Sequence, residues 1–140
     1  MNLSHAPLRL ATGAFILNSG LGKRELPDEA AAGLQGMAAN GVPAVKKLSP
    51  SSFGKALSAG EIALGAALLT PVFPSTVAGA GLVAFGSGLV NMYLNTPGLT
   101  EEGSKVKPSQ DGIGIAKDIW LVGAGLTLIA SGLADRRSRD

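Results

Sequence analysis

An uncharged run of 39 residues, residues 62–100, constrains the fold of this chain more than any other feature of its sequence. Because 16% of all residues are charged, a run of this length would carry about six charges on average. The run is twice the roughly 20 residues that a helix needs to cross a bilayer. Thr70, Pro71 and Pro74 interrupt it near its first third, where a turn is expected. The run therefore predicts a hairpin of two membrane-spanning helices.

The composition also favours a membrane protein over a soluble globule. The chain holds only 4 Phe, 1 Trp and 1 Tyr, although aromatic side chains usually dominate the burial of a soluble core. It holds 20 Gly instead, and small residues let helices approach one another closely in lipid. Two further uncharged runs, residues 10–22 and 119–134, predict one more span each.

We predict an all-α fold, a single integral-membrane domain over residues 1–140 built as a four-transmembrane-helix bundle. The expected spans are residues 7–22, 53–70, 75–94 and 112–133. The first covers only about 24 Å, so it stands nearly upright or places Arg9 and Lys23 at the two interfaces. A cleaved signal peptide is the alternative for this segment, but the segment lacks a positively charged start and a small-residue cleavage site.

The connection between the first and second spans, residues 26–52, is too long for a bare loop. Pro27, Asp28 and Glu29 form a helix start signal, and Asn40 and Gly41 form a stop signal. Apolar residues recur between them at helical spacing. We expect a short amphipathic helix on or near the membrane interface, while a surface helix packed on the bundle fits the same pattern.

Small residues recur four positions apart in three of the predicted spans. The three stripes are Ala59, Ala63 and Ala67; Ala80, Ala84 and Gly88; and Gly123, Thr127 and Ser131. Such stripes indicate helix contacts, either within one bundle or between protomers. We expect them to pack within the bundle.

Glu61 lies about eight residues inside the second predicted span, roughly 12 Å below its start. A carboxylate at this depth is costly and indicates either a function or a pairing partner. Because successive spans alternate in direction, several other polar side chains fall in the same half of the bilayer. They are Asn18, Lys23, Asn91, Asn95, Lys117 and Asp118. We therefore expect a polar cluster around Glu61.

Two roles for this predicted cluster remain open. Glu61 could relay a proton, bind a cation or hydrogen-bond the head group of a quinone that enters from the lipid. Alternatively, Lys117 or Lys23 neutralises Glu61, and the cluster serves as a structural network between helices. The residues favour the structural network, since polar pairs between helices are common in membrane bundles.

Several classes of function are unfavourable for this sequence. The absence of Cys excludes disulfides, thiolate catalysis and iron–sulfur ligation, and the single His5 cannot supply a pair of imidazoles for a metal or haem. A net charge of +2 does not suggest a nucleic-acid partner. We expect no metal and no enzyme activity of the chain on its own, and we expect membrane lipid and other membrane proteins as partners.

The distribution of positive charges leaves the membrane orientation open. Eight Lys and Arg residues lie on or near the two long connections, which favours cytoplasmic connections. Arg136, Arg137 and Arg139 directly follow the fourth span, where the positive-inside effect is strongest, and they favour cytoplasmic termini. We expect both termini in the cytoplasm.

Short motifs occur along the chain in an order that is similar to a known family. They are Leu8-Arg9-Leu10 with Gly13 and Phe15; Gly20-Leu21-Gly22-Lys23; Gly41-Val42-Pro43; Glu61 with Gly65, Leu68 and Leu69; and Lys117-Asp118-Ile119-Trp120-Leu121. Together they resemble the DoxX-like family of small four-helix bacterial membrane proteins, and the resemblance covers nearly the whole chain.

This resemblance implies a multi-pass protein of the bacterial plasma membrane that is an accessory subunit of a quinone-linked or oxidant-handling oxidoreductase complex. Founding members of the family resemble or form part of a thiosulfate:quinone oxidoreductase. The resemblance carries over no catalytic residue, and Glu61 matches its most recognisable polar position. The alternatives are a small transporter or a lipid- or quinone-binding protein that uses a polar pocket around Glu61, or a purely structural subunit of a larger membrane assembly.

Overall fold

The computed structural model describes residues 3–139, and these residues form an all-helical protein. A 3₁₀ turn, Leu3–His5, precedes the first helix, and a second one, Pro43–Lys47, precedes the third. The helices are α1 (Ala6–Gly22), α2 (Asp28–Gly41), α3 (Pro50–Leu69), α4 (Ser75–Asn95), α5 (Ile113–Ala116) and α6 (Ile119–Arg137). Among the described residues, extended pairing is limited to one isolated bridge between Thr100 and Pro108.

Local sequence signals explain where the long helices begin and end. Pro50 occupies the first turn of α3, where its missing N–H has no intrahelical acceptor, and the Ser49 side chain accepts a hydrogen bond from the backbone N–H of Ser52 at 3.2 Å. Pro71 and Pro74 separate α3 from α4. The first three predicted spans thus coincide with α1, α3 and α4 to within three residues.

The fourth predicted span, residues 112–133, differs from the structure. Lys117 and Asp118 separate the short α5 from α6, and α6 continues to Arg137. At the break, the backbone N–H groups of Asp118, Trp120 and Leu121 donate to carbonyls three residues earlier, which is the tighter 3₁₀ spacing. The expected continuous helix is therefore a short helix followed by a longer one.

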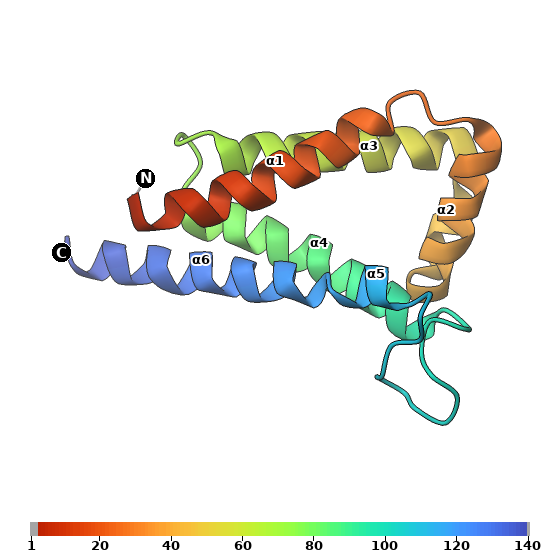
Figure 1. The fold of residues 1–140 in the computed structure, drawn as a ribbon. Helices are drawn as coiled ribbons and strands as arrows, with labels where there is room; N and C mark the ends of the chain where they lie inside the picture. The colour runs from red at the N-terminus through yellow and green to blue at the C-terminus, as the bar shows by residue number, and fades with distance from the viewer. Residues whose placement is uncertain (1–2, 140) are drawn as a thin grey trace.

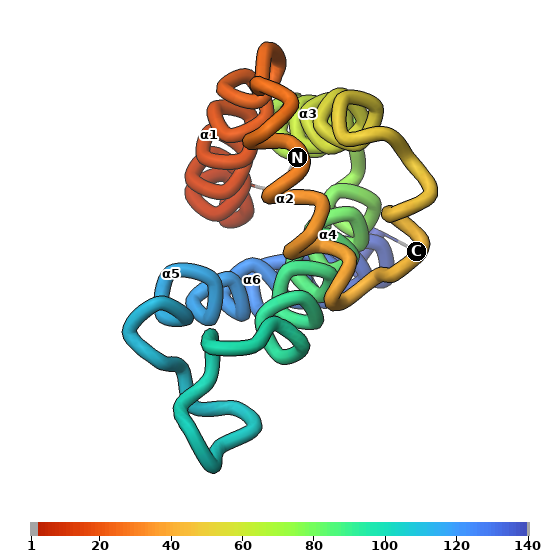
Figure 2. Tube along the Cα trace, turned by 90° about the vertical axis from the view of Figure 1, so that its right-hand side faces the viewer, coloured from red at the N-terminus to blue at the C-terminus, as the bar shows by residue number. Residues whose placement is uncertain are grey.

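The four long helices form two antiparallel pairs (Figure 1). α1 packs along α3, and α4 packs along α6, whereas contact between the two pairs is much smaller. Both termini and the α3–α4 turn lie at one end of the molecule, here called the terminal end (Figure 1). α2 crosses the opposite end and contacts both α3 and α4, so that it links the two pairs (Figure 2). We call this opposite end the α2 end.

The helix predicted between the first and second spans is α2, and it packs on the bundle. Ala31, Gln35 and Ala39 are its buried residues. The Gln35 side chain donates hydrogen bonds of 2.8 Å to the carbonyls of Val45 and Leu48, which holds the following connection against the helix. The geometry thus corresponds to a surface helix packed on the bundle, which was one of the two alternatives.

Glycines bring the helices of each pair into close contact. A Cβ atom on Gly65 would lie 2.6 Å from the backbone nitrogen of Leu17, and one on Gly79 would lie 2.7 Å from the carbonyl oxygen of Gly125. Such distances leave no room for a side chain. The buried core follows the same seam, with Ile16, Leu68, Ala78, Leu82 and Leu128 in one cluster.

The three predicted small-residue stripes do not make these contacts. Ala59, Ala63, Ala80, Ala84, Gly88, Gly123 and Thr127 are exposed, and Ala67 and Ser131 are half-buried. The expectation that the stripes pack within the bundle was wrong. The contacting glycines are instead seven positions apart on α1, α4 and α6, α3 contributes Gly65 alone to its pair, and these glycines lie on the face that also carries the buried large residues.

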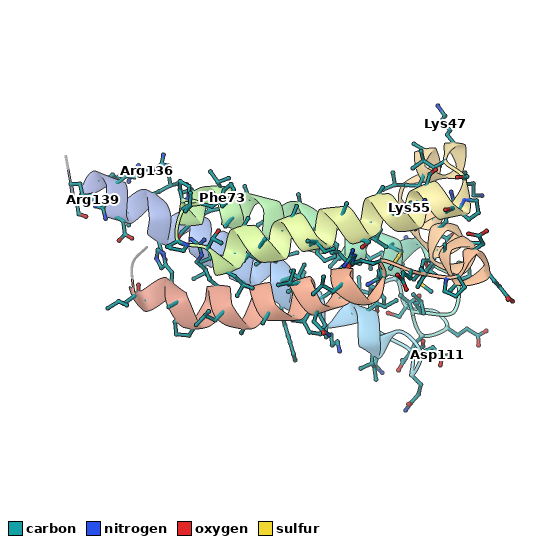
Figure 3. All side chains as sticks on the ribbon, turned by 90° about the horizontal axis from the view of Figure 1, so that it is seen from above. Lys47, Lys55, Phe73, Asp111, Arg136 and Arg139 are labelled. Carbon is teal, nitrogen blue, oxygen red and sulfur yellow. The ribbon has the colours of Figure 1, made fainter. Side chains whose placement is uncertain are left out.

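Two helical segments are long and apolar enough to cross a membrane, namely Ser75–Asn95 and Ile113–Arg137. Only 28% and 17% of their apolar windows are buried inside the structure, so most of this apolar surface faces outward. α1 has 17 residues, and α3 contains Lys55 and Glu61; neither is among these two segments. Labelled charged residues lie at the two ends of the molecule, with Arg136 and Arg139 at one end and Lys47, Lys55 and Asp111 at the other (Figure 3).

Candidate functional site

A cavity of about 390 Å³ lies at the α2 end and has walls from both helix pairs. α1, α2, α3 and α4 contribute to these walls, together with the segment that joins α5 to α6. Most of the lining is apolar and includes Phe15, Leu57, Phe85, Leu89 and Met92. The polar members of the lining are Ser19, Lys23, Glu61, Lys117 and Asp118. A mostly apolar space with a few polar groups has the character of a ligand pocket, and its volume falls in the usual range.

Glu61 and Lys23 form an ion pair on one wall of the cavity. The Lys23 Nζ donates a hydrogen bond of 3.0 Å to Glu61 Oε2. It also donates to Ser19 Oγ at 2.5 Å. The Glu61 side chain is 5% exposed and that of Lys23 is 21% exposed, so the pair is largely shielded from bulk solvent. A shielded pair of this kind is charge-neutral but retains groups that can hydrogen-bond a ligand.

Close packing of α1 on α3 places Glu61 at this position. Gly20 has no side chain, and a Cβ atom there would lie 2.9 Å from the Glu61 Cβ and 2.8 Å from the backbone nitrogen of Ile62. The Ser58 hydroxyl, one turn before Glu61, donates a hydrogen bond of 2.7 Å to the Gly20 carbonyl. This contact fixes the rotation of α3 against α1, and it turns Glu61 towards Lys23, one turn after Gly20.

Lys117 and Asp118 reach the same cavity from the other helix pair. They form the break between α5 and α6, where the Lys117 side chain is exposed and that of Asp118 is half-buried. They add one positive and one negative charge to the rim of the cavity. The charged groups of the lining therefore balance, with Lys23 against Glu61 and Lys117 against Asp118.

A groove of about 340 Å³ adjoins the cavity between α1 and α6. Phe15, Lys117, Asp118 and Leu121 line both the groove and the cavity. Trp120, whose side chain is 75% exposed, stands beside the groove. Because the pairing contacts are α1 with α3 and α4 with α6, the side between α1 and α6 is open to the surroundings of the bundle.

The structure brings together four of the seven residues predicted for the polar cluster, namely Lys23, Glu61, Lys117 and Asp118. The three asparagines lie elsewhere, with exposed side chains. Asn91 donates a hydrogen bond of 2.9 Å to the Gly41 carbonyl, which ties α4 to the end of α2. Asn95 donates to the side chain and carbonyl of Asn91. Asn18 lies at the same depth along α1 as the cluster, but its side chain is on the outer, exposed face of the helix.

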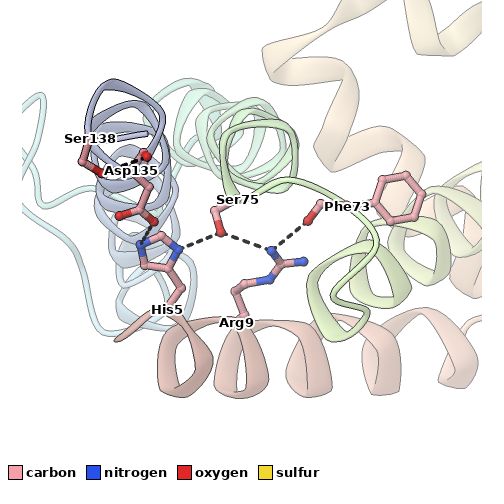
Figure 4. A network of polar contacts seen from close by, with 6 residues as sticks. All are labelled: His5, Arg9, Phe73, Ser75, Asp135 and Ser138. Carbon is pink, nitrogen blue, oxygen red and sulfur yellow. Dashed lines mark hydrogen bonds and ion pairs between the residues drawn. The ribbon is translucent and has the colours of Figure 1, made fainter. Parts of the chain in front are cut away.

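A second polar cluster lies at the terminal end, and the sequence analysis did not predict it. Arg9 is 1% exposed and donates five hydrogen bonds. Figure 4 shows those to Phe73 and Ser75. Four go to backbone carbonyls at the end of α3 and in the following turn, those of Ala67, Leu68, Thr70 and Phe73, at 2.7 to 2.9 Å. The fifth goes to Ser75 Oγ at 3.2 Å. Arg9 thus closes the C-terminal end of α3.

His5 extends this terminal cluster to α6. Its Nδ1 lies 2.8 Å from Ser75 Oγ, and its Nε2 lies 3.9 Å from Asp135 Oδ2 (Figure 4). The ring is 4% exposed. The only sequence signals for this cluster are a lone Arg in an apolar helix and a lone His before it, and their partners lie more than 55 residues away in the chain.

Among residues 3–139, no group of three or more His, Cys, Asp or Glu side chains is arranged to hold a metal ion. The cavity at the α2 end, with its apolar walls and the Lys23–Glu61 ion pair, is the candidate functional site, and it offers hydrogen bonding and burial of apolar surface. No family model, curated protein or solved structure matches this chain.

Proposed function

We propose that this chain is a multi-pass protein of the bacterial plasma membrane in which α1, α3, α4 and α6 all cross the bilayer. Helices of 20 and 21 residues, α3 and α4, extend about 30 Å, which equals the hydrocarbon thickness of a bilayer. α1 is about 26 Å long and lies against α3 along its length. Arg9 and Glu61 face partners inside the protein, so neither charge would contact lipid in such an arrangement.

The function proposed for this membrane protein is to bind an amphipathic molecule, a lipid or a quinone, in the cavity at the α2 end. One observation carries this proposal: an apolar cavity with an ion pair on its wall continues into a groove between α1 and α6. A lipid-like molecule would enter sideways through the groove. Its polar part would meet Lys23 and Glu61, and its apolar part would contact Phe85 and Leu89.

Filling the cavity tests this proposal. In the double variant Leu57→Trp and Leu89→Trp, two indole rings occupy part of the space that the ligand needs. The protein is purified gently from its native membrane, and mass spectrometry identifies the bound small molecules and proteins. We expect the wild-type protein to retain an amphipathic molecule in stoichiometric amount and the double variant to lose most of it.

The matched control is Leu126→Trp, which adds the same ring on the exposed face of α6. It should retain as much ligand as the wild-type protein does. Equal retention in the double variant and in this control would contradict the proposal.

A second candidate function is that of an accessory subunit for a quinone-linked or oxidant-handling oxidoreductase, as the resemblance to DoxX-like proteins implies. The observation that favours it is the outward position of the small-residue stripes, such as Ala59 and Ala63 on α3. Small residues on a lipid-facing surface allow the helix of a partner subunit to approach closely. The same gentle purification would then recover an oxidoreductase subunit together with the chain.

A further inference from the structure

The two helix pairs repeat one packing pattern. Gly13 and Gly20 on α1 are seven residues apart, as are Gly79 and Gly86 on α4. A Cβ on Gly13 would lie 2.9 Å from the Leu68 Cβ, and a Cβ on Gly79 would lie 2.9 Å from the Leu128 Cβ. α1 therefore corresponds to α4 with a shift of 66 positions, and α3 corresponds to α6 with a shift of 60.

Two more pairs of glycine contacts follow the same correspondence. Gly65 packs against Leu17, and its equivalent, Gly125, packs against Val83. Gly20 packs against Glu61 and Ile62, and its equivalent, Gly86, packs against Leu121 and Val122. Glu61 therefore holds the place in the first pair that Leu121 holds in the second.

Comparing equivalent positions of the two pairs shows which cavity residues are polar in one pair and apolar in the other. Ser19, Lys23 and Glu61 in the first pair correspond to Phe85, Leu89 and Leu121 in the second, and all six residues line the cavity. The second pair packs with apolar side chains at these places. Because removing two charges from water is costly and apolar residues of similar size often stabilise as well or better, packing alone does not require the Lys23–Glu61 pair.

We propose that Ser19, Lys23 and Glu61 form a head-group wall that binds the polar head of an uncharged amphipathic lipid. This inference rests on the proposed ligand-binding function and adds the chemical class of the ligand. The apolar chain of the lipid lies against Phe85 and Leu89 on the opposite wall.

The charge balance of the cavity selects an uncharged head. Lys23 already compensates Glu61 at 3.0 Å, and the rim carries one further charge of each sign. An anionic phosphate would add a negative charge beside the Glu61 carboxylate, which is unfavourable in a shielded site. A hydroxyl can donate to the carboxylate, and an ester or ketone oxygen can accept from the Lys23 ammonium group in place of the Ser19 carbonyl, which lies 3.4 Å from Nζ. Diacylglycerol has both groups and no charge.

The test replaces the head-group wall by the residues of the second pair. In the double variant Lys23→Leu and Glu61→Leu, the ion pair becomes the apolar pair found at Leu89 and Leu121. Native mass spectrometry of the detergent-solubilised full chain is carried out with an equimolar mixture of dioleoylglycerol and dioleoylphosphatidylglycerol. We expect the wild-type protein to bind dioleoylglycerol in preference, and the double variant to bind it at least about tenfold more weakly.

The thermal unfolding midpoint is measured in parallel, and it should be unchanged or higher in the double variant. The control is Lys107→Leu with Glu101→Leu, which removes an exposed Lys–Glu pair outside the cavity, with an N–O distance of 2.9 Å. It should bind dioleoylglycerol as the wild-type protein does.

Each other outcome has a separate meaning. A folded Lys23→Leu/Glu61→Leu variant with undiminished binding, or a wild-type preference for dioleoylphosphatidylglycerol, overturns the head-group assignment and leaves the proposed function standing. Loss of folding in that variant also overturns it, because the pair would then be needed for packing. If the wild-type protein binds neither this mixture nor any amphipathic molecule from its native membrane, the proposed function itself fails.

Discussion

Arg9 is the residue on which the terminal end of the molecule depends most directly. Its guanidinium group is buried and satisfies the carbonyls of Ala67, Leu68 and Thr70, which no intrahelical donor can reach at the end of α3. It also bonds Phe73 and Ser75, so one side chain joins α1, the end of α3 and the start of α4. An arginine has five N–H donors in a planar arrangement, and this site uses five hydrogen bonds.

Replacing Arg9 therefore tests whether its charge or its shape matters. Lysine keeps the charge but has three donors, so we expect Arg9→Lys to lower the free energy of unfolding by about 1–3 kcal/mol. Arg9→Met leaves all these acceptors without the donor, and we expect a loss of about 3–5 kcal/mol. Denaturant-induced unfolding in detergent, followed by circular dichroism, measures both. Arg24→Lys, at an exposed position, should have no effect; equal stability of Arg9→Lys and the wild-type protein would contradict this role.

At the scale of the helices, contact within each pair depends on glycine at a few defined positions. The seven-residue spacing places these glycines on the same face as the buried Ile16, Leu82 and Leu128. Each glycine allows the partner backbone to approach within a distance that a Cβ atom would prevent. Dispersion contacts along the two seams then hold the pairs together, as is typical of helices in lipid.

Gly65 and Gly60 of α3 allow the effect of close helix packing to be measured apart from helix propensity. At Gly65, a methyl group would overlap the backbone of Leu17, with distances of 2.6 and 2.7 Å, so we expect Gly65→Ala to destabilise the protein by about 1–3 kcal/mol. At Gly60, nothing lies within 4 Å of the added methyl group, and Gly60→Ala should stabilise the helix by about 0.5–1 kcal/mol. Thermal unfolding of both variants in the same detergent gives the comparison. A Gly65→Ala variant as stable as Gly60→Ala would mean that α1 and α3 are not closely packed at Gly65.

At the scale of the whole molecule, the main question is how many helices cross the membrane. If α1, α3, α4 and α6 all cross it, the termini and the α3–α4 turn share one side, and α2 lies on the other side. If only α4 and α6 cross it, the whole segment before α4 lies on the side of the termini. The connection between α2 and α3 is on opposite sides in the two arrangements, so its location decides between them.

The natural absence of Cys makes this measurement direct. Single cysteines are introduced at the exposed positions Lys47, Val72 and Lys105, and intact cells are treated with a membrane-impermeant maleimide. We expect Lys47→Cys and Lys105→Cys to be labelled alike, and Val72→Cys to differ from both. Labelling of Lys47→Cys together with Val72→Cys would instead establish the two-span arrangement.

The helix boundaries were predictable because their signals are local. Proline and serine residues mark the ends of α3 and the start of α4 within a few positions, and a long uncharged run identifies the helical hairpin without any tertiary information. The ion pair between Lys23 and Glu61 was one of the two pairings considered for Glu61, because the depth of a residue along a helix follows from its residue number.

The direction of each side chain around its helix was not predictable in this way. Asn18 has the expected depth but points outward, and the four-residue stripes lie on the outer faces because the helices pack through a different, seven-residue pattern. His5 and Arg9 were missed because their importance depends on acceptors that lie 58 to 70 residues away in the chain. Such partners become visible only when the helices are assembled.

In the proposed four-span arrangement, the separation between Arg9 and its acceptors also constrains the order in which the chain enters the membrane. When α1 leaves the ribosome, carbonyls 58 to 61 residues ahead of Arg9 have not yet been synthesised. An arginine on a solitary helix costs about 2.5–3.5 kcal/mol on insertion at the centre of a bilayer, and less near its edge. An α1 helix that crosses the bilayer would therefore gain its full stability there only after translation has passed Ser75. Biosynthesis of this protein is expected to deliver α1 and α3 to the lipid together, as a preassembled hairpin, before α4 and α6 follow.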